Sequence, residues 1–478
     1  MRVNWEDIKF FAWKYSTKKN LIIVGIVVLV ISLTLIIAGL FMTGKISVKS
    51  LAISSFSTIN KTVQLLAIEP DIKKEFEVVD ALVQKFTAQD NVERRFLFLL
   101  QNNTELRPGG GFLGQYAIVK VKNGEVTSSF FEDANLLDQK ITANVPPPYP
   151  FKRLLGIKNW KFRDSNFSPD FPTNAEKAKY FYRLAGGSTT FDGVIAVDAD
   201  VMKSVLALTG PITVPGYPET YTSENVVMAL EEKVEKAYIM DPELDTQARK
   251  DVMQKMTPLI IEKLFTLGNI TKIAEMVHNE LKNKDIMINF TDPELQKLVD
   301  SVYWNGKVAD TWGGDYLMMV DANMGAMKTD YYMRRSISYD VDFTQPKPVV
   351  TLNISYKNTA PSGDWRTSDY HSYLRIYAPK GSNFLERKMV GYPNIGEEFG
   401  KTYFGVKVDV LIGGETDAMI KYELPENIKP DDYRLLIQKQ SGVGEVPVKI
   451  HIKTKDGEAN QDATLIKDLQ FNLNRNNK

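Results

Sequence analysis

Residues 96–121 read FLFLLQNNTELRPGGGFLGQYAIVKV, and this stretch decides the fold of the chain. Its apolar ends, 96–100 and 116–121, are typical of two paired β-strands. The polar loop between them holds Asn102, Asn103, Glu105, Arg107, Gly109, Gly110 and Gly111. Consecutive glycines let the backbone approach a neighbour closely, and an arginine beside them can pair with an anion. The loop therefore predicts either an anion-binding lip at the strand ends or a wide, glycine-rich hairpin with a solvated arginine.

Length and charge set the class of protein. The 478 residues have room for two to four domains. The 59 basic and 59 acidic residues balance, which argues against a nucleic-acid-binding protein, because no positive field would attract phosphates. The chain has no cysteine, so disulfides and thiolate chemistry are excluded. Its histidines, His278, His371 and His451, lack the spacing of metal ligands.

Residues 21–42 read LIIVGIVVLVISLTLIIAGLFM and carry no charge. As a helix they would extend about 33 Å at the usual rise per residue, enough to cross the ~30 Å hydrocarbon core of a bilayer. Arg2 and four lysines precede them, and this basic excess predicts a cytoplasmic N-terminus with everything beyond residue 42 outside. We therefore expect a single-pass protein of the cell membrane, with a cytoplasmic tail (1–19) and a transmembrane helix (20–43).

The outer part divides into three regions. Apolar residues at helical spacing predict a helical stalk over 44–90. Strand and helix patterns alternate over 91–314, which is typical of an α/β layer domain, and Thr173 is expected to cap a helix over 175–184. Eight or so short alternating strands over 315–478 predict a β-sandwich. The expected fold class is thus α/β with a C-terminal β-sandwich.

A second polar loop lies in the α/β region. It holds Arg163, Asp164, Asn166, Ser168 and Asp170. Both loops flank strands, where α/β sheets place their sites. Together they could clamp a phosphate or diphosphate, with or without a divalent metal ion held by Asp164 or Asp170. The alternative is a loop of Asx-turns that an Arg–Asp pair braces internally.

Three segments carry a family resemblance: NNTELRPGGGFLG (102–114), RDSNFSPDFPTNA (163–175) and FDGVIAVDADVMKSVLALTGPITVPG (191–216). They resemble the motifs of the domain-of-unknown-function 4012 family, a family of bacterial membrane-anchored proteins, and the match covers roughly 94–237. That family has no established activity, so the resemblance implies the location of the chain more than its chemistry.

The order of elements also resembles the LytR-CpsA-Psr family, extracytoplasmic enzymes that transfer glycopolymers from a polyprenyl diphosphate carrier to peptidoglycan. The resemblance implies that Arg107 and Arg249 contact phosphate, and that Asp133, Asp164 and Asp170 hold Mg²⁺ or act as a base. The chain departs from that pattern at three places. Pro108 and glycines replace the aspartate expected after the first arginine, and the arginine of the Pro-Arg-Asp motif is absent. The double-arginine passage before the later helix is reduced to Arg249. Losing such groups would weaken electrostatic stabilisation of a transferring phosphate, so the catalysis is in question.

These observations lead to one functional hypothesis and one alternative. The first is a membrane-anchored, extracytoplasmic cell-envelope protein that binds an anionic lipid-linked or polymeric glycan, with a phosphotransferase-type transfer left open. Its partners would be the membrane and a polyprenyl-phosphate-linked glycan or peptidoglycan, and not nucleic acid. The alternative is a non-catalytic surface adhesion or structural protein. The candidate catalytic residues are Asp133 and Asp164, and the candidate metal ligands are Asp164 and Asp170. The candidate ligand-binding residues are Asn102, Asn103, Glu105, Arg107, Gly109, Gly110, Gly111, Arg163, Asn166 and Arg249.

Overall fold

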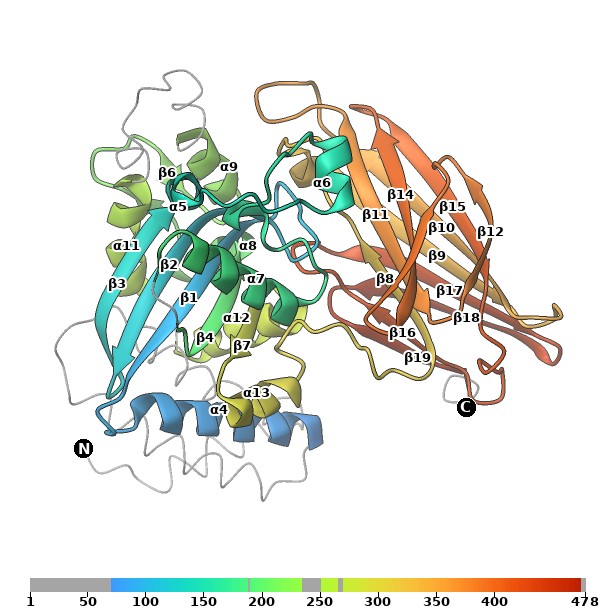
Figure 1. The fold of residues 1–478 in the computed structure, drawn as a ribbon, viewed down its shortest axis with the longest axis horizontal. Helices are drawn as coiled ribbons and strands as arrows, with labels where there is room; N and C mark the ends of the chain where they lie inside the picture. Colours follow the sequence, from blue (N-terminus) through green and yellow to red (C-terminus); the bar gives the residue numbers. More distant parts are fainter. Residues whose placement is uncertain (1–69, 188–189, 234–250, 265–269, 474–478) are drawn as a thin grey trace.

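The computed structural model describes residues 70–187, 190–233, 251–264 and 270–473, which form an α/β domain and a β-sandwich lying side by side (Figure 1). The expected cytoplasmic tail, the expected membrane helix, most of the expected stalk and Arg249 lie outside the described residues. Within the described part of the chain, no helix combines the length and the apolar character needed to cross a bilayer.

The α/β domain is built on a five-stranded sheet of order β3-β2-β1-β4-β7. Its strands are β1 (Glu93–Asn102), β2 (Phe112–Lys122), β3 (Glu125–Asp133), β4 (Gly193–Asp198) and β7 (Ile286–Phe290). β1 runs parallel to β4, and the other neighbouring pairs are antiparallel. The predicted Asn-Gly turn joins β2 to β3, with positive φ at both Asn123 and Gly124.

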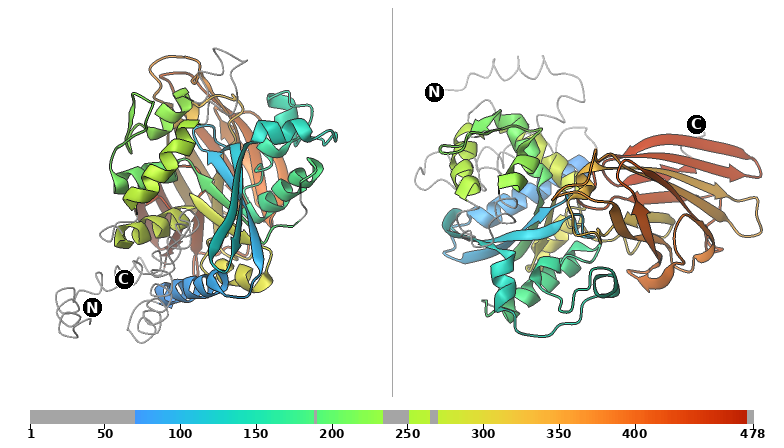
Figure 2. Two further views of the ribbon diagram at one scale, coloured as in Figure 1. Left: turned by 90° about the vertical axis from the view of Figure 1, so that its left-hand side faces the viewer. Right: turned by 90° about the horizontal axis from the view of Figure 1, so that it is seen from above.

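Apolar side chains point to both faces of β1, so helices cover the sheet on both faces. Phe96 faces a core shared with α4 and α8, whereas Leu97 and Leu99 face a second core shared with α5 and α7. The helices are α4 (Pro70–Thr87), α5 (Ala134–Lys140), α6 (Tyr149–Leu154), α7 (Phe171–Leu184), α8 (Asp200–Thr209), α9 (Val226–Glu231), α11 (Asp251–Leu264), α12 (Ile270–Asn283) and α13 (Pro293–Asp300). Figure 2 shows α5 and α7 on the opposite side of the sheet from α8 and α11. Short elements complete the domain: η1 (Phe162–Asp164), β5 (Ile212–Thr213) and β6 (Thr220–Tyr221).

Helix α4 corresponds to the second part of the region that was expected to form the stalk, residues 44–90. It buries Phe76, Val79, Leu82 and Val83 in the core of the α/β domain, and the ring of Phe86 lies 5.2 Å from that of Phe96. This part of the chain is therefore an integral helix of the α/β domain.

Beyond the α/β domain, two six-stranded sheets pack face to face. Their orders are β12-β15-β10-β9-β17-β18 and β13-β14-β11-β8-β16-β19. The strands are β8 (Asp315–Val320), β9 (Met333–Asp342), β10 (Val349–Asn358), β11 (Tyr370–Pro379), β12 (Asn383–Lys388), β13 (Asn394–Glu398), β14 (Lys401–Val410), β15 (Glu415–Glu423), β16 (Arg434–Gln438), β17 (Val446–Thr454), β18 (Gly457–Leu465) and β19 (Leu469–Asn472), with η4 (Thr329–Tyr332) before β9. The two parallel pairs are β8 with β16 and β9 with β17.

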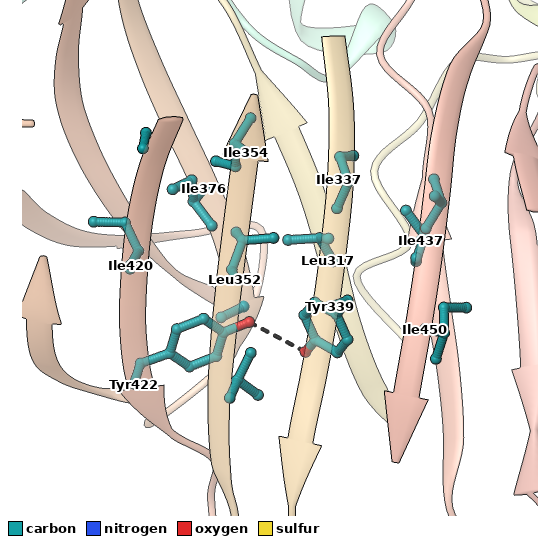
Figure 3. Close-up of a cluster of buried hydrophobic side chains, with 14 of the residues drawn as sticks. Leu317, Ile337, Tyr339, Leu352, Ile354, Ile376, Ile420, Tyr422, Ile437 and Ile450 are labelled. Carbon is teal, nitrogen blue, oxygen red and sulfur yellow. Dashed lines mark hydrogen bonds between the residues drawn. The ribbon is translucent and has the colours of Figure 1, made fainter. Parts of the chain in front are cut away.

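Both sheets contribute to the core of the sandwich, which is rich in leucine, isoleucine and tyrosine (Figure 3). The hydroxyls of Tyr339 and Tyr422 lie 3.1 Å apart in this core, and Tyr339 also donates to the buried carboxylate of Asp315 at 2.9 Å. Tyr433 donates to the same carboxylate at 2.7 Å. Buried tyrosine hydroxyls need such partners, so Asp315 ties the two sheets together.

Candidate functional site

Arg107 lies at the contact between the two domains and is only 2% exposed. Its Nη2 donates to Glu105 Oε1 at 2.8 Å and its Nε donates to Asp164 Oδ1 at 3.3 Å. Its Nη1 donates to the carbonyl oxygens of Leu106, at 3.4 Å, and Asn323, at 3.3 Å. Burial raises the pKa of Asp164, while the charge of Arg107 works in the opposite direction. The guanidinium is thus surrounded by partners from its own chain.

The three glycines bring the two predicted loops together. A Cβ at Gly109 would lie 2.3 Å from Nδ2 of Asn174, and one at Gly111 would lie 2.3 Å from the backbone of Asn102. The amide of Gly109 donates to the carbonyl of Asn166 at 3.0 Å. The loops therefore meet, as the sequence predicts, but protein atoms fill the space that the glycines leave.

The sandwich completes the hydrogen bonds of the β1–β2 loop, and we call this contact the interdomain junction. The amide of Leu106 donates to Asp330 at 3.0 Å, and its carbonyl accepts from the amide of Asn323 at 3.0 Å. Nε2 of Gln440 donates to the carbonyl of Arg107 at 3.2 Å. A Cβ at Gly442, whose φ is +77°, would lie 2.0 Å from the carbonyl oxygen of Gly110. The amide of Leu106 and the carbonyls of Leu106 and Arg107 therefore already have partners within the chain.

A second arginine supports the junction from the sandwich side. Arg335 contacts Asp321 at 2.9 Å and Asp330 at 2.8 Å, and it also donates to the hydroxyl of Tyr370 at 2.9 Å. Asp330 in turn accepts from the amide of Leu106. Sequence patterns did not indicate this cluster, because no local motif links its residues, which lie after β8 (Asp321), in η4 (Asp330), in β9 (Arg335) and in β11 (Tyr370).

The remaining predicted site residues have structural contacts of their own. Asp133 accepts from the amide of Asn135 at 2.8 Å and caps α5. Asp170 caps α7 by accepting from Thr173 at 3.1 Å, and it also accepts from Val308 at 3.1 Å. The prediction that Thr173 caps this helix is therefore wrong. Helix α7 begins at Phe171, four residues before the predicted start at 175, and Asp170 is its N-cap.

The predicted asparagines and Arg163 also have partners within the chain. Asn166 donates to Oε1 of Gln101 at 2.8 Å, and Asn102 donates to Glu231 at 2.7 Å. Arg163 pairs with Asp138. Across the described ranges, no three histidine, aspartate or glutamate side chains are gathered so that they could hold a metal ion. Ligand and metal binding at these residues stays a prediction, and their contacts favour the braced-loop alternative.

A cavity of about 650 Å³ lies beside the junction, and we call it the interdomain crevice. Its lining includes Asn103, Lys203, Tyr331, Arg334 and Glu445. Of these, only Asn103 was a sequence-predicted residue. The others come from α8, η4, β9 and the loop before β17, so only the assembled fold brings them together.

Residues 91–234 match the model of a family described as a protein of unknown function (DUF4012). The family resemblance is thereby confirmed for this part of the chain. No curated protein matches the chain. Among solved structures, it is similar to the X-ray structure of the Lin1025 protein from Listeria innocua, at 15% identity over 45% of this chain and 80% of that one. A TM-score of 0.24 does not establish a shared fold. The resemblance to the LytR-CpsA-Psr family is not confirmed.

Proposed function

We propose that the chain is a non-catalytic surface protein of the bacterial cell envelope, anchored by residues 21–42, whose outer part acts as one rigid two-domain unit. The observation that carries this proposal is the burial of Arg107 between Glu105 and Asp164, at a loop whose backbone is bound by the sandwich. The membrane location rests on the uncharged apolar stretch and the basic residues before it.

Glycan transfer from a diphosphate carrier would need cations that can reach the phosphates and carboxylates that can reach a metal ion. To contact a phosphate, Arg107 would have to leave the buried carboxylate of Asp164, and Glu105 would keep only its longer contact with Lys328, at 3.9 Å. Removing one member of such a buried pair typically costs about 3–5 kcal/mol. It would also have to abandon the carbonyls of Leu106 and Asn323. A structural role requires none of these rearrangements, so it agrees best with the geometry.

The test uses the full-length protein in lipid nanodiscs, incubated with Mg²⁺, a polyprenyl-diphosphate-linked glycan and peptidoglycan. We expect no transfer above the protein-free background. Transfer by the wild type that is lost in Arg107→Ala and Asp164→Asn, measured at a temperature where both variants remain folded, would contradict the proposal and restore the glycopolymer transferase hypothesis. Arg153→Ala, which changes an exposed arginine of α6, is the matched control.

A further inference from the structure

We propose that the interdomain crevice is a binding site for an acidic saccharide, a hydroxylated sugar ring with one anionic substituent. This goes beyond the proposed function, which requires no ligand. The crevice volume of about 650 Å³ lies within the ~300–1,000 Å³ range of small-molecule sites. Its walls come from both domains, and domain contacts are a common location for such sites.

An unsatisfied amide oxygen in the wall of the crevice is the first sign of a ligand. Asn103 is 9% exposed, and its Nδ2 donates to the carbonyl of Gly442 at 3.2 Å. Its Oδ1 has no hydrogen-bond partner among the described residues. A buried acceptor left in this state costs about 1–3 kcal/mol, so it implies a missing donor. A sugar hydroxyl supplies that donor.

Cations in the crevice lining favour an anionic substituent on the ligand. Arg334 is exposed, and Nη1 donates to the carbonyls of Tyr331 at 3.1 Å and Met333 at 3.0 Å; none of the described carboxylates forms an ion pair with it. Lys203 lies in the first turn of α8, a helix that begins without a side-chain cap. Backbone N–H groups at such a start add positive potential. One carboxylate or phosphate group on the ligand would complement this wall.

The remaining lining groups limit the total charge and favour a sugar. Lys203 pairs with Asp200 at 2.6 Å, and Asp330, which is paired with Arg335, and Glu445 add two further carboxylates to the lining. These three carboxylates would repel a polyanion such as a diphosphate. Carboxylates instead accept hydrogen bonds from hydroxyls, which a sugar ring carries in number. A singly charged, hydroxyl-rich ring satisfies all of these groups at once.

A glycine at the rim allows the location to be tested without touching a charge. A Cβ at Gly444 would have no heavy atom within 4 Å, and its φ is not positive. Gly444→Trp can therefore occupy crevice volume with little strain on the backbone. Arg334→Gln removes the exposed cation and keeps most of the side-chain length. Arg153→Gln, on α6 and outside the crevice lining, is the matched control.

The experiment measures binding to full-length protein in nanodiscs by ligand-observed NMR, with glucuronic acid, glucose 6-phosphate and glucose as separate probes, each at millimolar concentration. We expect the acidic sugars to bind roughly tenfold more tightly than glucose, which corresponds to about 1.4 kcal/mol. Arg334→Gln should abolish that difference, Gly444→Trp should abolish binding of all three sugars, and Arg153→Gln should behave as wild type. Preference between the two acidic sugars identifies the substituent as carboxylate or phosphate.

Three results would overturn the proposal: no binding of any probe, binding that survives Gly444→Trp, or an acidic preference that survives Arg334→Gln. If no probe binds, only water satisfies the amide oxygen of Asn103. None of these outcomes bears on whether the protein transfers glycan, so the failure of this inference is distinct from failure of the proposed function.

Discussion

The interdomain junction and the interdomain crevice lie side by side and use the same kinds of residues, yet they differ in how their polar groups are satisfied. At the junction, Arg107 and Asp330 have partners within the chain for their charged groups. In the crevice, the amide oxygen of Asn103 has none among the described residues, and Arg334 forms no ion pair with any of them. Residue type alone therefore does not distinguish a structural contact from a ligand-binding site. The presence or absence of hydrogen-bond partners does.

The largest expected effect is at the junction. Arg107→Ala should lower the free energy of unfolding by about 3–5 kcal/mol, because Asp164 would remain buried without its hydrogen-bonded cation and Glu105 would keep only the 3.9 Å contact with Lys328. Chemical denaturation measures this loss. The control Arg153→Ala, at an exposed position, should change stability by no more than about 0.5 kcal/mol. Equal stability of the two variants would show that the junction is not a brace.

Two glycines of one loop should separate the junction from the crevice. Gly442→Ala places a Cβ against the carbonyl oxygen of Gly110 at a positive φ, so we expect a loss of roughly 1–3 kcal/mol of stability. Gly444→Ala meets no neighbour and should be neutral within about 0.5 kcal/mol. Thermal unfolding of the two variants provides the comparison, and similar melting temperatures would contradict the close contact at the junction.

Stability should also depend on pH through carboxylates beneath the junction. Burial raises the pKa of Asp285 to about 7, and it holds the pKa of Asp198 well above its usual range. A carboxyl whose folded-state pKa is raised contributes stability that is present below its unfolded-state pKa and is lost as pH rises through the folded-state value. The free energy of unfolding should therefore fall between about pH 4 and 7, by at most about 1.4 kcal/mol per pH unit for each group.

Asp285→Asn is the variant that checks this dependence. The change leaves a neutral side chain of the same shape, so the fall in stability over that pH range should become shallower. Unfolding curves measured at intervals across the range would reveal it. An unchanged slope in the variant would mean that Asp285 is not the titrating group.

The sequence predicted the parts of the molecule that local patterns determine. The β1–β2 hairpin, the Asn123–Gly124 turn and the alternation of strands and helices were all recognisable from apolar periodicity and turn residues. The meeting of the Arg107 loop with the Asp164 loop was also anticipated. That the charged groups of these loops pair with each other was only the alternative hypothesis. Their burial depends on the sandwich domain, which packs against the Arg107 loop.

Long-range contacts account for what the sequence could not predict. The amide of Leu106 donates a hydrogen bond to Asp330, and the side chain of Gln440 donates one to the carbonyl of Arg107. The partners in each bond are hundreds of residues apart in the sequence, and no local motif connects them. The cap of α7 illustrates the same limit at short range. Thr173 and Asp170 both suit a cap, and the additional bond from Val308 to Asp170 comes from a distant segment. Tertiary contacts thus decided between residues that local chemistry left equivalent.

The most direct test of the central claim is a double-mutant cycle between Arg107 and Asp164, measured as free energies of unfolding. We predict that Arg107→Ala and Asp164→Asn are each destabilising and that the double variant loses less stability than the sum of the two single losses, with a coupling of about 1–3 kcal/mol. Additive losses would mean that the two residues do not stabilise each other, and would contradict the internal brace.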